Sequence, residues 1–216
     1  MPIRMRIIVR WGAIVALPVL SACAVAPGQV GAPDTNTSTS YTLPGLFVAF
    51  GTSSSQSDQK YDAANPVALT AAVVADFGAA IAFCDAIDGA EYTVDCLSER
   101  LDVIAEKLPE TGEFAEMRGI IADASQQLGA IAGQNPSTTL PARVISSTGT
   151  APVSTTRPLR PVAADSLAAN LAAADAVIAQ AQVTLLRSTS NSQERAISYQ
   201  QVAAIVGRSR TLLRSA

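Results

Sequence analysis

Residues 65–108 are NPVALTAAVVADFGAAIAFCDAIDGAEYTVDCLSERLDVIAEKL, and they decide the fold. Asn65 is a helix-capping residue followed by proline, which favours the first helical position, so a helix is predicted to begin there. The pair Asp88-Gly89 offers its end, because glycine readily takes the left-handed conformation that stops a helix. From about residue 90 to 108 apolar residues recur at alternating steps of three and four, which predicts a second helix. So short a turn between two helices favours an antiparallel pair.

Two cysteines flank the predicted turn of this hairpin. Cys84 lies a little before the turn and Cys96 a little after it, so both are expected on facing turns of the two helices. An exported protein meets an oxidising compartment, where an even pair of cysteines predicts a disulfide. A bond that closes a loop of this size would contribute about 3 kcal/mol. The alternative is a pair of buried, reduced thiols.

Three further helices are predicted after the hairpin. A third follows Pro109, with Thr111 as its cap, and ends at Gly133. A fourth is expected from about residue 162 to 187, and a fifth from near Ser190, where the sequence has the form of a capping box. The chain is rich in alanine and poor in aromatic residues, a composition that suits closely packed helices. The sequence therefore predicts an all-α fold, an antiparallel helical bundle of about five helices.

The N-terminus has the form of an export signal. Three arginines within the first ten residues precede an uncharged apolar run that ends in Leu20-Ser21-Ala22-Cys23. This order resembles the lipobox of bacterial lipoproteins, in which diacylglycerol is attached to the cysteine thiol and the cysteine becomes the first residue of the mature chain. The resemblance implies lipid attachment, with acyl chains such as palmitate, at Cys23. The alternatives are ordinary secretory cleavage that leaves Cys23 as a free thiol, and a retained anchor helix, although the run is shorter than the about 20 residues of a membrane span.

The residues after the lipobox bear on location. Ala24, not aspartate, follows the cysteine. In the Gram-negative sorting pattern, which this resembles, that choice implies transfer to the outer membrane, facing the periplasm. The following residues are mostly polar and bury too little apolar surface to offset the entropy of ordering. Residues 43–51, LPGLFVAFG, interrupt them and form either a short extended segment tucked against the body or a docking or membrane-contact patch.

The predicted helices divide into a three-helix part and a C-terminal helix pair behind a disordered N-terminal tether. Between the two parts the chain is rich in proline, serine and threonine, which predicts a linker in mostly extended conformations. A connection this long either crosses the surface of a bundle or separates two halves. The predicted segments are a signal peptide at 1–22, a lipidated polar tether at 23–63, a helical region with the Cys84–Cys96 hairpin at 64–133, the linker at 134–161 and the helix pair at 162–216.

Composition excludes several classes of chemistry. Histidine is absent, which removes His-based triads, His general bases and nearly all zinc or haem sites. The net charge of −3 becomes −6 once the three arginines of the signal are removed, which argues against general nucleic-acid binding. The chain has neither a glycine-rich phosphate loop nor a GxSxG elbow. We therefore predict no enzymatic activity, no cofactor, no metal and no nucleic-acid partner.

Carboxylates gather at the turn of the hairpin and along its second helix. Those at the turn are expected to be solvated, because the spacing of a calcium loop is missing; they are Asp85, Asp88, Glu91 and Asp95. The others are expected on the polar side of the second helix, where a carboxylate pair for glycoside chemistry lacks an apolar pocket; they are Glu99, Asp102 and Glu106.

Charge is distributed unevenly along the chain. Residues 24–140 hold 15 acidic and 4 basic residues, whereas residues 141–216 hold 3 acidic and 8 basic ones. Arg208, Arg210 and Arg214 lie within the last predicted helix. One interpretation is that this helix packs beside the acidic hairpin and that its cations suit a helix C-terminus. The other is that these arginines contact an anionic envelope polymer, a lipid head group or an acidic partner protein.

Two classes of function follow from these observations. The first is a membrane-anchored, periplasm-facing helical lipoprotein that acts as a non-enzymatic structural or adaptor component of the cell envelope, through an envelope protein partner or self-association. The alternative is a binding protein for a small apolar ligand or an anionic envelope polymer. A large cavity in the bundle would favour the binding protein, whereas a solid core with an exposed apolar groove would favour the adaptor.

Overall fold

The structure is a computed structural model that describes residues 60–148, 152–188 and 192–216. These residues belong to one compact unit, Gly51–Ala216. The signal peptide, Cys23, the stretch at 43–51 and nearly all of the predicted tether lie outside the described residues.

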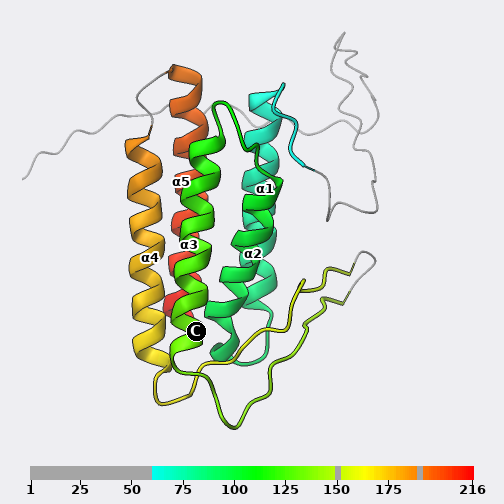
Figure 1. Ribbon diagram of the computed structural model, residues 1–216, viewed down its shortest axis with the longest axis vertical. Coiled ribbons are helices and arrows are strands. Elements are labelled where there is room, and N and C mark those ends of the chain that lie inside the picture. Colours follow the sequence, from blue (N-terminus) through cyan, green and yellow to red (C-terminus); the bar gives the residue numbers. More distant parts are fainter. Residues whose placement is uncertain (1–59, 149–151, 189–191) are drawn as a thin grey trace, which may run out of the picture. The chain divides into compact units, whose positions relative to one another are not determined.

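Five α-helices form an antiparallel bundle (Figure 1). Helix α1 packs between α2 and α5, α3 packs between α2 and α4, and α4 packs against α5, so the helices close into a ring. The elements are α1 (Pro66–Asp85), the 3-10 helix η1 (Ala90–Tyr92), α2 (Thr93–Lys107), α3 (Ala115–Gln134), α4 (Leu167–Arg187) and α5 (Gln193–Ser215). The predicted all-α bundle is confirmed, and the three-helix part and the C-terminal pair form one body.

The hairpin at the centre of the prediction is present. The side chain of Asn65 caps α1 by accepting a hydrogen bond from the backbone N–H of Ala68 at 3.0 Å. Gly89 has a φ of +106°, which a residue with a side chain adopts only with strain, and it turns the chain toward α2. Cys84 and Cys96 are both buried and form a disulfide, with a Cα–Cα distance of 5.8 Å. The predicted disulfide is therefore part of the fold.

Several predicted helix boundaries were wrong. The third helix begins after Phe114, not after Thr111, because Gly112 with a φ of +80° keeps the chain turning. The fourth begins at Leu167, five residues later than expected, because Val162 is extended and donates its N–H to the carbonyl oxygen of Glu91 at 2.9 Å. The fifth begins at Gln193, after Ser192, whose hydroxyl caps the helix. Ser190 lies outside the described residues.

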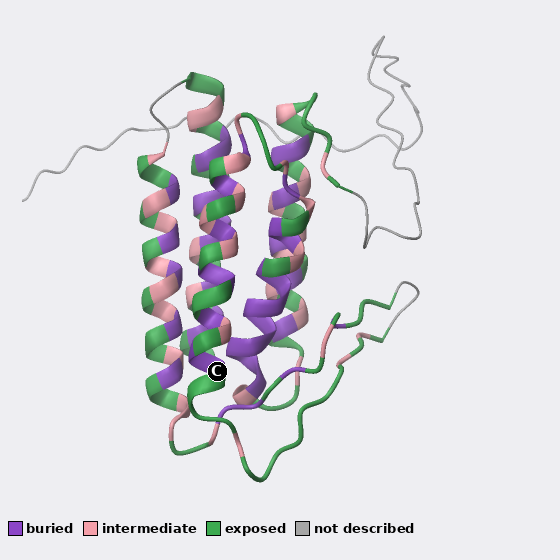
Figure 2. Cartoon of the chain, viewed as in Figure 1, coloured by how far each residue is buried: buried purple, intermediate pink, exposed green. Residues whose placement is uncertain are grey.

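The apolar residues that recur along the second helix are buried as predicted, but the expected polar side of this helix is largely buried as well. Every residue from Tyr92 to Leu101 is buried, including polar and charged ones (Figure 2). Helices α1 and α3 cover two sides of α2. The predicted linker covers a third side, and this extra neighbour explains why the polar side of α2 is not exposed.

The linker is a folded part of the bundle. The described residues 136–148 and 152–162, here called the arm, form two limbs, one that leaves α3 and one that returns to the start of α4 (Figure 1). Antiparallel β-bridges join the two limbs at Pro136 and Val162, at Arg143 and Leu159, and at Ser146 and Ser154. The described residues contain these isolated bridges but no strand. Of the two predicted geometries, the arm follows the one that crosses the bundle surface.

Candidate functional site

Two carboxylates of α2 form the centre of the most polar buried region. Asp95 and Glu99 are 0% and 2% exposed, and they lie four residues apart, so their side chains share one face of the helix. The returning limb of the arm lies over that face. Buried charges are stable only when they are paired and hydrogen-bonded, so each carboxylate must find its partners in the arm or in α2.

Asp95 is held by two arginines of the arm. Arg157 donates two hydrogen bonds to it, from Nη1 at 2.5 Å and from Nη2 at 3.1 Å. Arg160 adds one from Nη2 at 2.9 Å and one from its backbone N–H at 2.8 Å. Burial alone would raise the pKa of Asp95, but the hydrogen bonds from Arg157 and Arg160 outweigh it and leave that pKa below its usual value. The carboxylate is therefore ionised across the physiological range and fixes two points of the arm.

Glu99 holds the arm one helical turn further along α2. Its Oε1 accepts hydrogen bonds from the backbone N–H of Thr156 at 2.7 Å and from the Thr156 hydroxyl at 2.9 Å. The adjacent Arg100 pairs with Glu99 and donates from Nη2 to the carbonyl oxygen of Ser154 at 3.0 Å. The Arg100 guanidinium also lies over the ring of Phe83, 4.9 Å from its centre. Asp95 and Glu99 together fix the returning limb from Ser154 to Arg160.

Helices α2 and α3 approach each other closely beside these carboxylates. Ser98 donates its hydroxyl to the carbonyl oxygen of Ser125 at 2.9 Å, and Ser125 donates to the carbonyl oxygen of Ser98 at 2.8 Å. A Cβ at Gly129 would lie 2.9 Å from the Ser98 hydroxyl oxygen, so this approach requires glycine.

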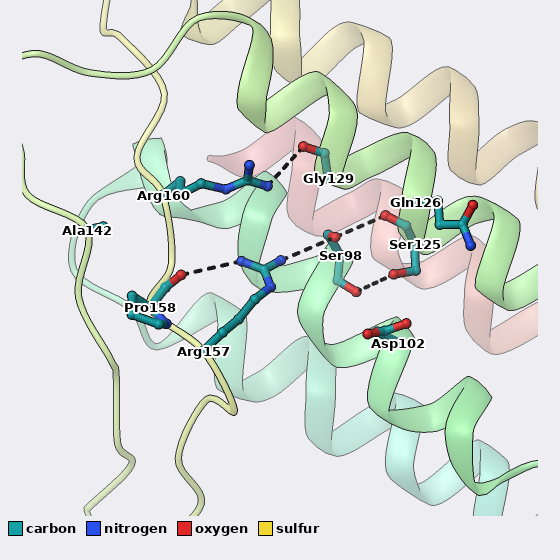
Figure 3. Close-up of a pocket in the computed structure, with 9 residues that line it drawn as sticks. All are labelled: Ser98, Asp102, Ser125, Gln126, Gly129, Ala142, Arg157, Pro158 and Arg160. Atoms are coloured by element: carbon teal, nitrogen blue, oxygen red, sulfur yellow. Dashed lines mark hydrogen bonds between the residues drawn. The ribbon is translucent and has the colours of Figure 1, made fainter.

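An open hollow of about 610 Å³ lies between α2, α3 and the arm (Figure 3). Arg157 points toward Ser98 and Arg160 toward the carbonyl oxygen of Gly129, so both guanidinium groups border the hollow. Its lining residues are Ser98, Asp102, Ser125, Gln126, Gly129, Ala142, Arg157, Pro158 and Arg160. Most of its polar side chains already hold the arm or join α2 to α3. We call the contacts of Asp95 and Glu99 with the arm the clamp, and the hollow is bordered chiefly by side chains that form this clamp or join α2 to α3.

A smaller hollow of about 240 Å³ lies at the same end of the bundle, bordered by the disulfide region and the C-terminus. Both hollows are open to solvent. No group of three cysteine or carboxylate side chains suited to a metal ion occurs among the described residues.

The predicted solvation of the acids was wrong for two of them. Asp95 and Glu99 are buried under the arm, whereas Asp85, Asp88, Asp102 and Glu106 are exposed. Sequence reasoning did not identify Arg157 and Arg160 as their partners. One signal was available, because residues 136–162 contain three arginines and no acidic residue, beside a strongly acidic hairpin.

The three arginines predicted to contact an anionic partner lie in different surroundings. Arg210 donates to Asp175 of α4 at 2.9 and 3.0 Å, and Arg214 donates to the same carboxylate at 3.1 Å. The hydrogen bond from Arg210, followed by that from Arg214, lowers the pKa of Asp175 to about 2. Arg208 is exposed and has no ion pair within the described residues.

The interpretation that the last helix packs beside the acidic hairpin is confirmed, because α5 packs against α1. Its described ion pairs, however, reach other helices. Arg210 and Arg214 pair with Asp175 on α4, and Arg195 pairs with Glu116 on α3. Of the buried acids of the hairpin, Asp95 is paired with two arginines of the arm, and Glu99 with the neighbouring Arg100 of α2.

Helices α1 and α4 are long and apolar enough to cross a membrane, judged by length and composition alone. Core helices of soluble bundles pass the same test, and both helices here bury one side in the bundle. Their other sides are nearly uncharged, because α1 carries only Asp76 and Asp85 and α4 only Asp175 and Arg187. These outer sides are rich in alanine.

Comparison with protein-family models, curated proteins and solved structures finds no match for this chain. The proposals below therefore rest on the chain's own residues.

Proposed function

We propose that this chain is a lipid-anchored protein of the cell envelope, facing the periplasm from the outer membrane. Its helical bundle acts as a non-enzymatic structural or adaptor component. The lipobox resemblance of Leu20-Ser21-Ala22-Cys23 and the following Ala24 support the anchor and the location. The observation that carries the proposal is the Cys84–Cys96 disulfide inside the hairpin, because such bonds persist in oxidising, exported compartments.

The adaptor role is supported by the distance between the arm and the point at which the described chain begins. The described chain begins beside the last turn of α2, where Tyr61 donates its N–H to the carbonyl oxygen of Lys107 at 3.0 Å. Asp76 accepts hydrogen bonds from the Tyr61 hydroxyl at 2.7 Å and from Lys107 Nζ at 3.0 Å, which fixes the chain there. The arm lies at the other end of the 20-residue helix α1, about 30 Å away by the rise of an α-helix. A chain anchored at Cys23 would therefore enter the bundle at one end and present the arm at the other.

A non-enzymatic role is supported by what the polar side chains already do. The arginines and serines at the larger hollow hold the arm on α2 or join α2 to α3. The alternative, a binding protein for a small apolar ligand, would need an apolar cavity, and both hollows open at the surface. The alanine-rich outer sides of α1 and α4 suit contact with other helices, either of a partner or of another copy.

The anchor is tested by membrane fractionation with metabolic labelling by a palmitate analogue. The Cys23→Ser variant should lose the label and leave the membrane fraction. The matched control is the double variant Cys84→Ser/Cys96→Ser, which also removes thiols but should keep both the label and the membrane attachment. Membrane retention of Cys23→Ser would overturn the proposed anchor.

A second candidate function is contact with an anionic envelope polymer, favoured by the charge near the end of α5. Arg210 and Arg214 share the single carboxylate of Asp175, and Arg208, which precedes them on a different side of α5, is exposed. If this surface binds a polyanion, the affinity of the chain for the polyanion should fall with added salt and in Arg208→Ala, but not in Arg187→Ala on α4. If both variants bound the polyanion as tightly as the wild type does, this function would be excluded.

A further inference from the structure

The outgoing limb of the arm has a free edge. The main-chain groups of Arg143, Ile145 and Ser147 face the returning limb: Arg143 exchanges two hydrogen bonds with Leu159 at 3.1 and 2.8 Å. The carbonyl oxygen of Ile145 accepts from the N–H of Thr155 at 2.9 Å, and the N–H of Ser147 donates to the carbonyl oxygen of Val153 at 2.8 Å. Successive residues of an extended chain face opposite ways, so the groups of Ala142, Val144 and Ser146 face outward. Within the described residues these outward N–H and C=O groups have no hydrogen-bond partner.

The side chains along this edge leave it accessible. Val144 is 55% exposed and Val153, on the other limb, is 48% exposed. Ala142 and Ser146 are small and also exposed. An accessible row of unpaired main-chain groups is a template on which another extended chain can pair.

The edge is held rigidly by the clamp on α2. Asp95 and Glu99 fix the returning limb, and that limb pairs with the outgoing one. Arg143 adds a second support, because its guanidinium lies 4.4 Å from the centre of the Tyr92 ring and donates to the carbonyl oxygen of Asp88 at 2.7 Å. A partner strand would therefore meet an edge that is already in place, which lowers the entropic cost of binding.

Charge indicates the chemistry of the partner strand. Residues 136–162 contain three arginines and no acidic residue. Arg157 and Arg160 are paired with Asp95, but Arg143 has no ion pair within the described part of the chain. Arg143 is exposed, and its charge would attract a carboxylate on a paired strand. A second copy is a poor occupant, because antiparallel pairing of two such edges about Val144 would bring the two Arg143 side chains close together.

We propose that the outer edge from Ala142 to Ser146 docks an extended, acidic segment of a partner protein by β-strand addition. This inference rests on the proposed function in one respect, since it names the kind of partner that an adaptor would hold. Binding at the edge does not require Cys23, and the fractionation test does not involve Val144, so either proposal can fail without the other.

The test is peptide binding to the full chain purified in a non-ionic detergent. The probe is a fluorescent, end-blocked hexapeptide of alternating glutamate and valine, and binding is measured by fluorescence anisotropy. Val144→Pro removes the outward N–H of residue 144, while the N–H groups of residues 143 and 145 remain, and should weaken binding about tenfold or more. Val144→Ala is the matched control, because it shortens the same side chain but keeps the N–H, and it should bind nearly as the wild type does.

Three further comparisons test the chemistry of the contact. Arg143→Gln should weaken binding several-fold and reduce its dependence on salt, and a lysine-valine peptide should bind the wild type more weakly than the acidic one. A peptide with methylated backbone nitrogens should not bind. In the wild type, the bound acidic peptide should slow hydrogen exchange of the Val144 and Ser146 amides, a readout that does not depend on any variant.

Several results would overturn the proposal. The first is that the acidic peptide does not bind the wild type at millimolar concentration. The second is that Val144→Pro binds the acidic peptide as tightly as the wild type does, or that the methylated peptide binds as tightly as the unmethylated one. The third is that the bound peptide leaves the hydrogen exchange of the Val144 and Ser146 amides unchanged.

Discussion

Two carboxylates of this bundle are each held by a pair of arginines, yet their surroundings differ. Asp95 on α2 is fully buried, and its partners Arg157 and Arg160 come from the arm. Asp175 on α4 has a side chain 20% exposed, and its partners Arg210 and Arg214 come from the neighbouring helix α5. The chemistry of the two clusters is alike. Burial and the element that supplies the arginines are what differ.

The difference teaches what each cluster does for the fold. Helices α4 and α5 pack through an apolar interface, so the Asp175 cluster adds to a contact that already exists. An exposed ion pair contributes little, about 0–1 kcal/mol. The arm has few buried apolar side chains, among them Leu159 and Val162, and depends on Asp95 and Glu99 for its position. Only the carboxylate of this cluster is buried, because the side chains of Arg157 and Arg160 are 37% and 47% exposed, so removing Asp95 costs mainly its four hydrogen bonds, at about 1 kcal/mol each.

The largest effect is expected from Asp95→Ala. This change removes the four hydrogen bonds by which Asp95 holds Arg157 and Arg160 and should lower the free energy of unfolding by about 2–4 kcal/mol. Urea denaturation measures it. The control is Asp102→Ala, an exposed position on the same helix, which should change stability by less than about 0.5 kcal/mol. If the two variants were equally stable, the contacts of Asp95 would not contribute to the stability of the fold as proposed.

The disulfide on the same helix provides a second stability change with which the effect of Asp95→Ala can be compared. Loss of the Cys84–Cys96 bond in the double serine variant should cost about 3 kcal/mol in unfolding free energy. The bond itself is checked by thiol labelling of the unfolded chain, in which neither cysteine should react until a reductant is added. Labelling of both cysteines without reductant would show that the chain carries free thiols instead.

The stability contributions of the Asp95 and Asp175 clusters should respond differently to acid and to salt. The pKa of each carboxylate is lower in the folded chain than its unfolded value of about 3.9, so each stabilises the fold above about pH 4 and loses that contribution as the pH falls through its folded pKa. Salt near 1 M shortens the Debye length to about 3 Å and screens exposed charges far more than buried ones. Comparing Asp95→Asn and Asp175→Asn with the wild type between pH 5 and 2 isolates each contribution. High salt should abolish the Asp175 contribution and leave most of that of Asp95; equal screening of both would contradict the comparison.

The smallest effect is expected from Asp175→Ala. The loss of this partly buried cluster should reduce the unfolding free energy by about 1–2 kcal/mol, because a folded pKa of about 2 corresponds to at most about 2.6 kcal/mol and solvent screens part of it. The same urea titration provides the value. A loss as large as that of Asp95→Ala would mean that the α4–α5 interface, and not the arm, depends on buried charge.

The parts of the fold that the sequence predicted are those encoded locally. Asn65 and Pro66 mark the start of α1, Gly89 marks the turn, and the cysteines lie within twelve residues of each other. Each signal lies within one or two helical turns of the feature that it determines. The same is true of Ser192, which caps α5.

The candidate site depends on contacts that no local pattern contains. Arg157 and Asp95 are 62 residues apart, and Thr156 and Glu99 are 57 apart. Polar residues at 95 and 99 looked like a solvated helix side, because the arm that covers them is itself polar and rich in proline. The late start of α4 has the same origin, since Val162 is held extended by the arm's return to Glu91.

The most direct test of the account is hydrogen exchange of the arm in the wild-type chain. The amides of Thr156 and Arg160 donate to Glu99 and Asp95, and the amide of Arg143 pairs with Leu159. If the buried carboxylates fix the arm, these three amides should be protected in the wild type and in Asp175→Ala, and should lose protection in Asp95→Ala while the amides within α3 and α5 stay protected. Unprotected exchange of all three in the wild type would contradict the account, because the arm would then not be held on α2.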